Sequence, residues 1–167
     1  EVRAFFEQRK AALVESRKQW DATYSAWQTA NPEKATLLQS GLSREVPADL
    51  MDKVQVFAED AKVATRAAGS QIINDLAKAC PLLVSGSADL HGSTKNYLKE
   101  LGDFSREDRS GRNLLFGIRE HAMGAIVNGI GYYGIFWPSG ATFAVFADYM
   151  RGSVRLSALV GLPIFHI

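Results

Sequence analysis

The chain has 167 residues, of which 47% are hydrophobic and 22% charged, a balance that indicates a globular domain and argues against disorder. Nineteen basic and eighteen acidic residues give a formal net charge of +1, so bulk electrostatics imply neither a nucleic-acid nor a membrane partner. The single cysteine, Cys80, excludes an internal disulfide, and its apolar helical setting indicates a buried, inert thiol.

The first segment, residues 1–29, is predicted to be one amphipathic helix. Its apolar and aromatic side chains stand among many charges at helical spacing; they are Phe5, Phe6, Leu13, Trp20, Tyr24 and Trp27. Asn31 and Pro32 should end this helix and begin a short second one, which residues 43–47 break. We interpret the segment as a connector whose aromatic stripe packs on another domain, with ligand contact as the alternative.

From about residue 58 the pattern becomes an alternation of helices and strands. We expect a helix over 60–80, a polar loop over 90–112, a helix from about 117 to 130, another over 143–159, and strands at 82–84, 114–116, 135–137 and from 164. The first helix should bury Ala64, Ala67, Ile72, Ile73 and Leu76. The alternation predicts an α/β fold, a parallel sheet with helices on both faces.

The apolar stretch over residues 122–147 raises the question of a membrane span. Asn128, Pro138, Ser139 and several glycines interrupt it, so we reject a transmembrane helix. The chain begins without a signal-like region and ends within residues 162–167, which read as a strand just begun. We therefore expect a piece of a longer protein.

Glu120 is the most informative candidate for chemistry, because it stands where the strand at 114–116 becomes a helix. Gly117 permits close backbone approach at that point, and ligands of open α/β sheets bind at such seams. A carboxylate that is fixed and partly desolvated there can act as an acid or base. The alternative is a first-turn glutamate that only stabilises the helix dipole.

Five motifs in order resemble the transketolase family of thiamine diphosphate enzymes. They read ATR at 64–66, GSADL at 86–90, GIREHAMG at 117–124, ATFAVFADYMRG at 141–152 and RLSAL at 155–159. The resemblance is strong over about the last hundred residues. It implies a pyrimidine-binding domain over 58–167, truncated at its C-terminus. Residues 1–57 are more loosely similar to the helical linker that follows the family's diphosphate-binding domain.

The resemblance assigns cofactor-binding roles to five residues. Glu120 matches the glutamate that hydrogen-bonds a nitrogen of the cofactor's pyrimidine ring, a task that requires a raised pKa in a pocket of low polarity. Phe143, Phe146 and Tyr149 match the aromatic wall against that ring, although such a stripe is otherwise typical of a helix core. Asp89 matches a carboxylate near the thiazolium, with a turn or helix cap as the equal alternative.

Arg66 and Ser93 match the family's contacts to the phosphate end of the substrate, since a guanidinium fork and a hydroxyl both donate to phosphate. Many relatives have proline just before this serine and asparagine just after it, whereas Gly92 and Thr94 stand here. That departure puts the role of the serine and the acceptor preference in doubt. Lys95 is a candidate for added phosphate affinity.

No metal site is expected in this chain, because His91, His121 and His166 show no ligand spacing with one another or with Cys80. In the family, a Gly-Asp-Gly motif and a downstream asparagine of a different domain hold the diphosphate and a divalent metal, magnesium or calcium. This chain has no Gly-Asp-Gly. The family's His-Asp-Ser segment, expected just beyond Ile167, is also absent.

The resemblance implies an enzyme that moves a two-carbon ketol unit from a ketose phosphate to an aldose phosphate, as in the pentose phosphate pathway or the Calvin cycle. It further implies a homodimer with active sites between subunits, located in the cytoplasm or a plastid stroma, and a fragment that is inactive alone. The alternatives are another ketol-transfer enzyme, such as dihydroxyacetone synthase, and a non-catalytic homologue. A deoxyxylulose-phosphate synthase fits less well, because other residues are expected around its glutamate.

Overall fold

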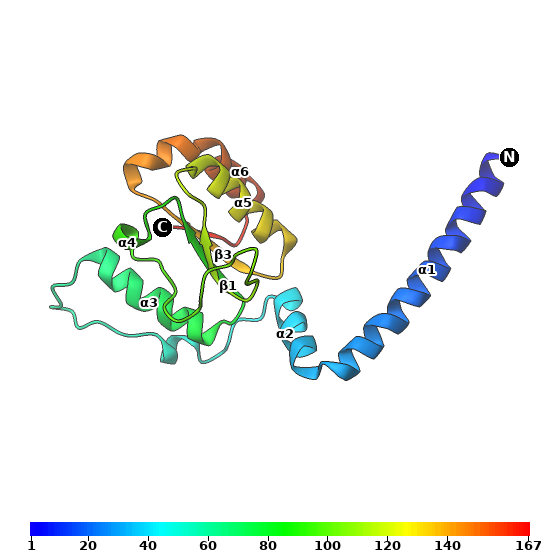
Figure 1. Cartoon of the computed structure of the whole chain (residues 1–167), viewed down its shortest axis with the longest axis horizontal. Coiled ribbons are helices and arrows are strands. Elements are labelled where there is room, and N and C mark those ends of the chain that lie inside the picture. The colour runs from blue at the N-terminus through cyan, green and yellow to red at the C-terminus, as the bar shows by residue number, and fades with distance from the viewer. The chain divides into compact units, whose positions relative to one another are not determined.

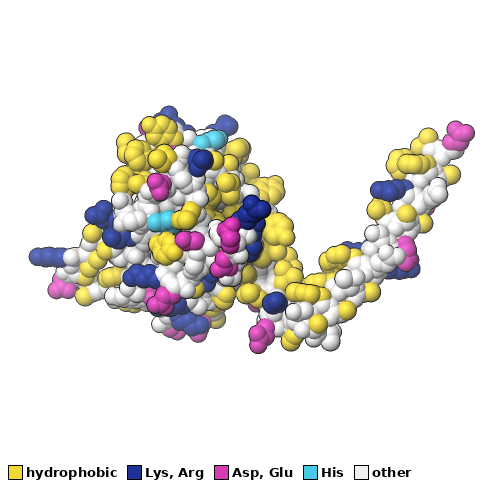
Figure 2. All heavy atoms as spheres, viewed as in Figure 1, with side chains coloured by type: hydrophobic (Ala, Val, Ile, Leu, Met, Phe, Trp, Pro, Cys, Tyr) yellow, Lys and Arg dark blue, Asp and Glu magenta, His cyan; other side chains and the backbone are white.

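The computed structural model describes all 167 residues and divides them into two units, Glu1–Ser43 and Arg44–Ile167. The first unit consists of helices α1 (Val2–Ala30) and α2 (Pro32–Ser43), which confirms the predicted helices and the position of Pro32. α1 buries none of its residues, and Figure 2 shows hydrophobic side chains exposed along its length. Asn31 joins the helices by donating from its side chain to the carbonyl of Trp27 at 3.0 Å.

The second unit is built on a parallel sheet, which confirms the predicted α/β class. Its strands are β1 (Leu83–Ser87), β2 (Asn113–Leu115), β3 (Trp137–Ala141) and β4 (Phe165–His166), in the order β2-β1-β3-β4. Helix α3 (Thr65–Ala79) lies on one face of the sheet, while α5 (Glu120–Tyr133) and α6 (Arg151–Val160) lie on the other (Figure 1). The remaining elements are short: η1 (Leu50–Lys53), α4 (His91–Thr94) and η2 (Ala144–Met150).

Two small apolar clusters hold the helices to the sheet. Ile73, Ala77, Leu83 and Leu98 form the cluster under α3, and Ala88, Met123, Val127 and Met150 form the cluster under α5. The sheet itself is lined with small residues, which let α5 approach closely. A Cβ on Gly140 would stand 3.2 Å from Val127 and 3.3 Å from Met123, so a side chain there would require these neighbours to shift by a few tenths of an ångström.

A partly buried cation fixes the loop between α3 and β1. Arg112 donates to the carbonyls of Leu83, Ala77 and Cys80 at 2.8, 3.0 and 2.9 Å, and so satisfies the end of α3. Cys80 is half-buried against the core, and this burial raises the pKa of its thiol. The thiol form is therefore favoured at neutral pH, in keeping with an unreactive side chain.

Several predicted boundaries were wrong. α3 begins at Thr65 rather than at 60, because Ala64 is extended (φ −61°, ψ 136°); Ala64 and Ala67 are exposed. The helix expected over 143–159 is a 3-10 helix followed by an α-helix. β3 lies two residues later than predicted, at Trp137–Ala141. No helix combines the length and the apolar character needed to cross a bilayer.

Candidate functional site

The carboxyl ends of the strands gather the candidate residues at one edge of the sheet. β1 has β2 on one side and β3 on the other, so the connections of the chain change direction beside it. This is the place where open parallel sheets form ligand crevices. Glu120 begins α5 at that edge, Asp89 follows β1, and Arg66 lies in the first turn of α3, which runs back along the sheet.

The first cavity at this edge, here called the Glu120 cavity, has a volume of about 480 Å³ and is smaller than a second cavity described below, which has a volume of about 740 Å³. Its lining consists of Ala88, Asp89, Leu90, Ile118, Glu120, Phe146 and Tyr149. Three of the predicted cofactor residues therefore accompany Glu120. Glu120 is only 9% exposed and makes no hydrogen bond or ion pair with another residue. A buried carboxylate without a protein partner is available to a ligand that donates to it.

The aromatic residues enter from η2. Because a 3-10 helix has three residues per turn, Phe146 and Tyr149 lie on one side of it, with ring centroids 6.2 Å apart. Phe143 stacks on Phe146 at 5.8 Å, but it precedes the helix in an extended conformation. Its ring lines the second cavity rather than the Glu120 cavity.

Asp89 lies between the Glu120 cavity and a smaller cavity of about 280 Å³. It has a left-handed backbone (φ 62°), which aspartate tolerates better than most residues. The turn is fixed by Ser87, whose hydroxyl donates to the carbonyl of Ala141 and accepts from the amide of Leu90, each at 3.0 Å. α4 has no side-chain cap, so the carboxylate of Asp89 is not used to cap it.

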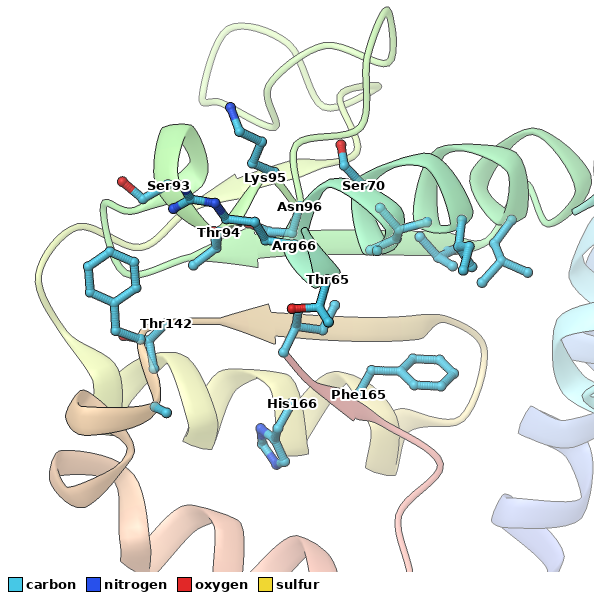
Figure 3. A pocket seen from close by; sticks show the side chains of 18 residues that line it. Thr65, Arg66, Ser70, Ser93, Thr94, Lys95, Asn96, Thr142, Phe165 and His166 are labelled. Carbon is cyan, nitrogen blue, oxygen red and sulfur yellow. Dashed lines mark hydrogen bonds between the residues drawn. The ribbon is translucent and has the colours of Figure 1, made fainter. Parts of the chain in front are cut away.

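The second cavity, here called the Arg66 cavity, has a volume of about 740 Å³ and brings the predicted phosphate contacts together. In Figure 3, Arg66 extends from α3 toward Ser93 on α4. Thr142 and Phe143 contribute from the end of β3, and Ile72, Ile73, Leu76 and Leu83 form an apolar wall. No aspartate or glutamate lines this cavity.

Sequence reasoning missed the residue that shapes the loop after β1, Asn96. It is 2% exposed, and its side-chain amide donates to the hydroxyl of Ser85 and the carbonyl of Gly86, both at 2.8 Å. Its side-chain oxygen accepts from Thr94 at 2.7 Å and from the Nδ1 of His91 at 3.2 Å. Thr94, which departs from the family pattern, thus contributes one of these hydrogen bonds, and its hydroxyl also lies 2.9 Å from the carbonyl of Leu90. No periodicity in the sequence marks such a buried amide.

The histidines lie apart from one another. His121 is exposed on α5, whereas the Nε2 of His166 on β4 lies 3.1 Å from the hydroxyl of Ser157, and burial lowers the pKa of His166. Nowhere do three His, Cys, Asp or Glu side chains gather as metal ligands would.

Comparison with known proteins identifies the family of this chain. Residues 61–167 match the family model described as "Transketolase, pyrimidine binding domain". The transketolase of Physarum polycephalum is 52% identical over 166 residues, covering 99% of this chain and 25% of that protein. The transketolase of Dictyostelium discoideum is 48% identical over 167 residues, covering 100% of this chain and 25% of that protein.

Solved structures agree with these sequence relatives. A transketolase from Pichia stipitis in complex with sedoheptulose-7-phosphate has a TM-score of 0.85 at 36% identity, covering 91% of this chain and 24% of that one. A transketolase from Leishmania mexicana also has a TM-score of 0.85, at 32% identity, covering 92% and 23%. The chain spans about a quarter of the length of these relatives. It belongs to the transketolase family, with residues 61–167 as its pyrimidine-binding domain.

Proposed function

We propose that these residues form the pyrimidine-binding part of a thiamine diphosphate-dependent transketolase. The whole enzyme transfers a two-carbon ketol unit from a ketose phosphate to an aldose phosphate. The observation that carries the proposal is the carboxylate of Glu120, a largely buried residue, which has no protein partner and lines a cavity shared with Asp89, Phe146 and Tyr149. The relatives of this chain are transketolases, and one related structure is described as a complex with a sugar phosphate.

The lining of the Glu120 cavity fits the pyrimidine of the cofactor. Glu120 would accept a hydrogen bond from a protonated ring nitrogen and could share that proton, a task suited to a carboxylate with no protein partner. Phe146 and Tyr149 stack against the flat ring and exclude water, while Ile118 adds apolar surface. Asp89 at the rim balances the positive charge of the thiazolium. When bound, the cofactor supplies the nucleophilic carbon that accepts and releases the ketol unit.

Arg66 and Ser93 hold the phosphate end of the sugar in the Arg66 cavity. Both donate, and neither the guanidinium nor the hydroxyl is engaged by another residue of the chain. A planar guanidinium can present two N–H groups to one phosphate, which fixes orientation as well as charge. The linear substrate would therefore extend from the edge near Asp89 toward α3.

The remaining contacts come from outside these residues. We propose that a diphosphate-binding domain holds the diphosphate and a magnesium or calcium ion, and that a second subunit of a homodimer completes each active site. The proposal is supported by the coverage of the relatives, of which this chain matches about a quarter. Transketolases act in the pentose phosphate pathway and the Calvin cycle. We propose a location in the cytoplasm or a plastid stroma; one relative, 41% identical over 161 residues, is named a chloroplastic transketolase of Arabidopsis thaliana.

A ketol-transfer assay on the full-length protein that carries these residues tests the proposal. We expect transfer from xylulose 5-phosphate to ribose 5-phosphate that depends on added thiamine diphosphate, and thermal stabilisation by the cofactor. The 167-residue chain alone should neither bind the cofactor tightly nor catalyse the transfer. Stabilisation without transfer would favour a non-catalytic homologue, and transfer only to acceptors without phosphate would favour an enzyme such as dihydroxyacetone synthase.

A further inference from the structure

The cavity of about 280 Å³ beside Asp89, here called the His91 cavity, contains a histidine ring that the proposed function does not use. Three titratable side chains line it, those of Asp89, His91 and Tyr97. The hydroxyl of Tyr97 already donates to Asp103 at 2.8 Å. Histidine is the side chain whose charge ordinarily changes between about pH 5 and pH 8, so this ring is the candidate for a contact that depends on pH.

Hydrogen bonds of Asn96 fix the tautomer of His91. The side-chain amide of Asn96 donates to the hydroxyl of Ser85 and the carbonyl of Gly86, both at 2.8 Å, so its oxygen is left to face the ring. The Nδ1 of His91 lies 3.2 Å from that oxygen and carries the proton that is donated to it. The free lone pair of neutral His91 is therefore on Nε2, which is buried without a hydrogen-bond partner.

Protonation of His91 creates a need for an acceptor. It would place a hydrogen and a positive charge on Nε2, and a buried, charged N–H group without an acceptor is costly. The ring of Tyr97 lies perpendicular to that of His91, with centroids 5.3 Å apart, and carries no negative charge. Asp89 provides the only carboxylate in the lining of the cavity. It is therefore the group to which protonated His91 is attracted.

Asp89 can serve either of two cavities, because it lines both the His91 cavity and the Glu120 cavity. Its side chain is exposed and takes part in no ion pair. Its backbone is held in the left-handed region (φ 62°), next to the amide of Leu90, which donates to the hydroxyl of Ser87 at 3.0 Å. A change of rotamer at Asp89 thus redirects the carboxylate without a change in the loop.

We propose that His91 is a positioning residue for Asp89. Neutral His91 leaves the carboxylate free to face the Glu120 cavity and the cationic ring of the cofactor. Protonated His91 attracts the carboxylate across the His91 cavity, directly or through one water molecule, and withdraws it from the cofactor. The inference rests on the proposed function, since it concerns the contact of Asp89 with thiamine diphosphate. The proton on His91 and the cofactor compete for one carboxylate, so each weakens the binding of the other by the same factor.

Calorimetric titration of thiamine diphosphate into the full-length protein, with magnesium present, tests this role in His91→Asn and in a control, His121→Asn. Asparagine at position 91 keeps an N–H donor for Asn96 but cannot become charged. His121 is exposed on α5 and lines neither the His91 cavity nor the Glu120 cavity. Between about pH 8 and about pH 5.5, the affinity of the wild type should fall about tenfold more than that of His91→Asn, because a neighbouring opposite charge ordinarily shifts a protonation equilibrium by at least that factor. His121→Asn should follow the wild type.

Asp89→Asn provides a second test that does not require His91→Asn to fold. Asparagine tolerates the left-handed backbone of this position, so the variant should keep the loop. Its loss of cofactor affinity relative to the wild type should be about tenfold smaller at about pH 5.5 than at about pH 8, since protonated His91 has already withdrawn the carboxylate in the wild type. The same loss at both pH values overturns the inference, as does an identical pH dependence in the wild type and His91→Asn.

A double-mutant cycle in thermal unfolding, without cofactor, separates this inference from the proposed function. The wild type, His91→Asn, Asp89→Asn and the double variant should show coupling between the two positions at about pH 5.5 and none at about pH 8. Coupling that is the same at both pH values indicates a structural role only and overturns the inference. If the full-length wild type does not bind thiamine diphosphate, the proposed function fails, and this cycle still decides whether His91 and Asp89 attract each other.

Discussion

The two cavities occupy the same edge of the sheet but differ in the solvent exposure of their charged residues. Glu120 begins α5 on one face of the sheet and is buried, whereas Arg66 lies in the first turn of α3 on the other face and is exposed (Figure 1). One cavity contains two carboxylates beside aromatic rings, and the other contains two cations and an apolar wall but no carboxylate. A buried carboxylate suits proton transfer, while exposed cations suit capture of a charged substrate.

This contrast predicts different kinetic signatures. Changes in the Glu120 cavity should act on the chemical step and on cofactor binding, and they should depend little on salt. Changes in the Arg66 cavity should act on KM for phosphorylated substrates and weaken as ionic strength rises, because the Debye length is about 10 Å at 0.1 M salt. Each variant below is a test of that division in the full-length protein.

The largest effect is expected from Glu120→Gln. The amide has nearly the shape of the carboxylate but cannot share a proton with a ring nitrogen in the same way, so deuterium exchange at C2 of the cofactor should slow by about 10²- to 10⁴-fold. Glu59→Gln, at an exposed position between helices, is the control and should leave exchange unchanged. Normal exchange in Glu120→Gln, with the fold intact by circular dichroism, would contradict the assignment.

Arg66→Ala should have the next largest effect, on KM rather than on exchange. Hydrogen bonds to a charged group contribute about 1.5–3 kcal/mol, so KM for phosphorylated acceptors should rise about 10- to 100-fold, with little change for unphosphorylated ones. Arg106→Ala, on an exposed loop and without a hydrogen bond or ion pair, is the matched control. A similar rise for both kinds of acceptor would refute the division between the cavities.

The sequence predicted the layered fold because its alternating apolar segments each bury one face. It predicted boundaries less well where small polar residues replace apolar ones. β1 continues through Ser85, Gly86 and Ser87. The hydroxyls of the two serines are buried and hydrogen-bonded within the sheet, so this part of the strand has no apolar side chains that a periodic pattern could reveal. The helix over 143–159 was predicted as continuous, since periodicity does not distinguish three from 3.6 residues per turn over so short a segment.

The sequence indicated candidate site residues but not which of them share a cavity. The motif order indicated Glu120, Phe146 and Tyr149, which the fold brings to one cavity with Asp89. The same order placed Phe143 beside them, yet an extended residue before η2 turns its ring into the other cavity. The placement of Phe143 and Phe146 in different cavities depends on the φ and ψ angles of Phe143, which a spacing of three residues in the sequence does not specify.

Phe146→Leu tests that separation with a moderate effect. Leucine keeps an apolar contact but loses the stacked ring, which contributes about 1 kcal/mol beyond burial, so cofactor affinity should fall about fivefold. Phe143→Leu is the matched variant, because its ring lines the Arg66 cavity, and it should change cofactor affinity less. Calorimetric titration of thiamine diphosphate into both variants measures the difference. Equal losses would show that Phe143 also belongs to the cofactor wall.

The smallest expected effect is on the pH dependence of folding stability, and it comes from His166 in the lining of the Arg66 cavity. Burial lowers the pKa of His166, so the unfolded chain binds its proton more readily than the folded chain. Stability from this residue is therefore present above the unfolded pKa of about 6.5 and is lost as pH falls through the lower folded pKa. His166→Gln, which keeps a neutral group near Ser157, should show a shallower fall in melting temperature between about pH 7.5 and pH 5. Parallel curves for both proteins would exclude the contribution, because the other histidines are common to both.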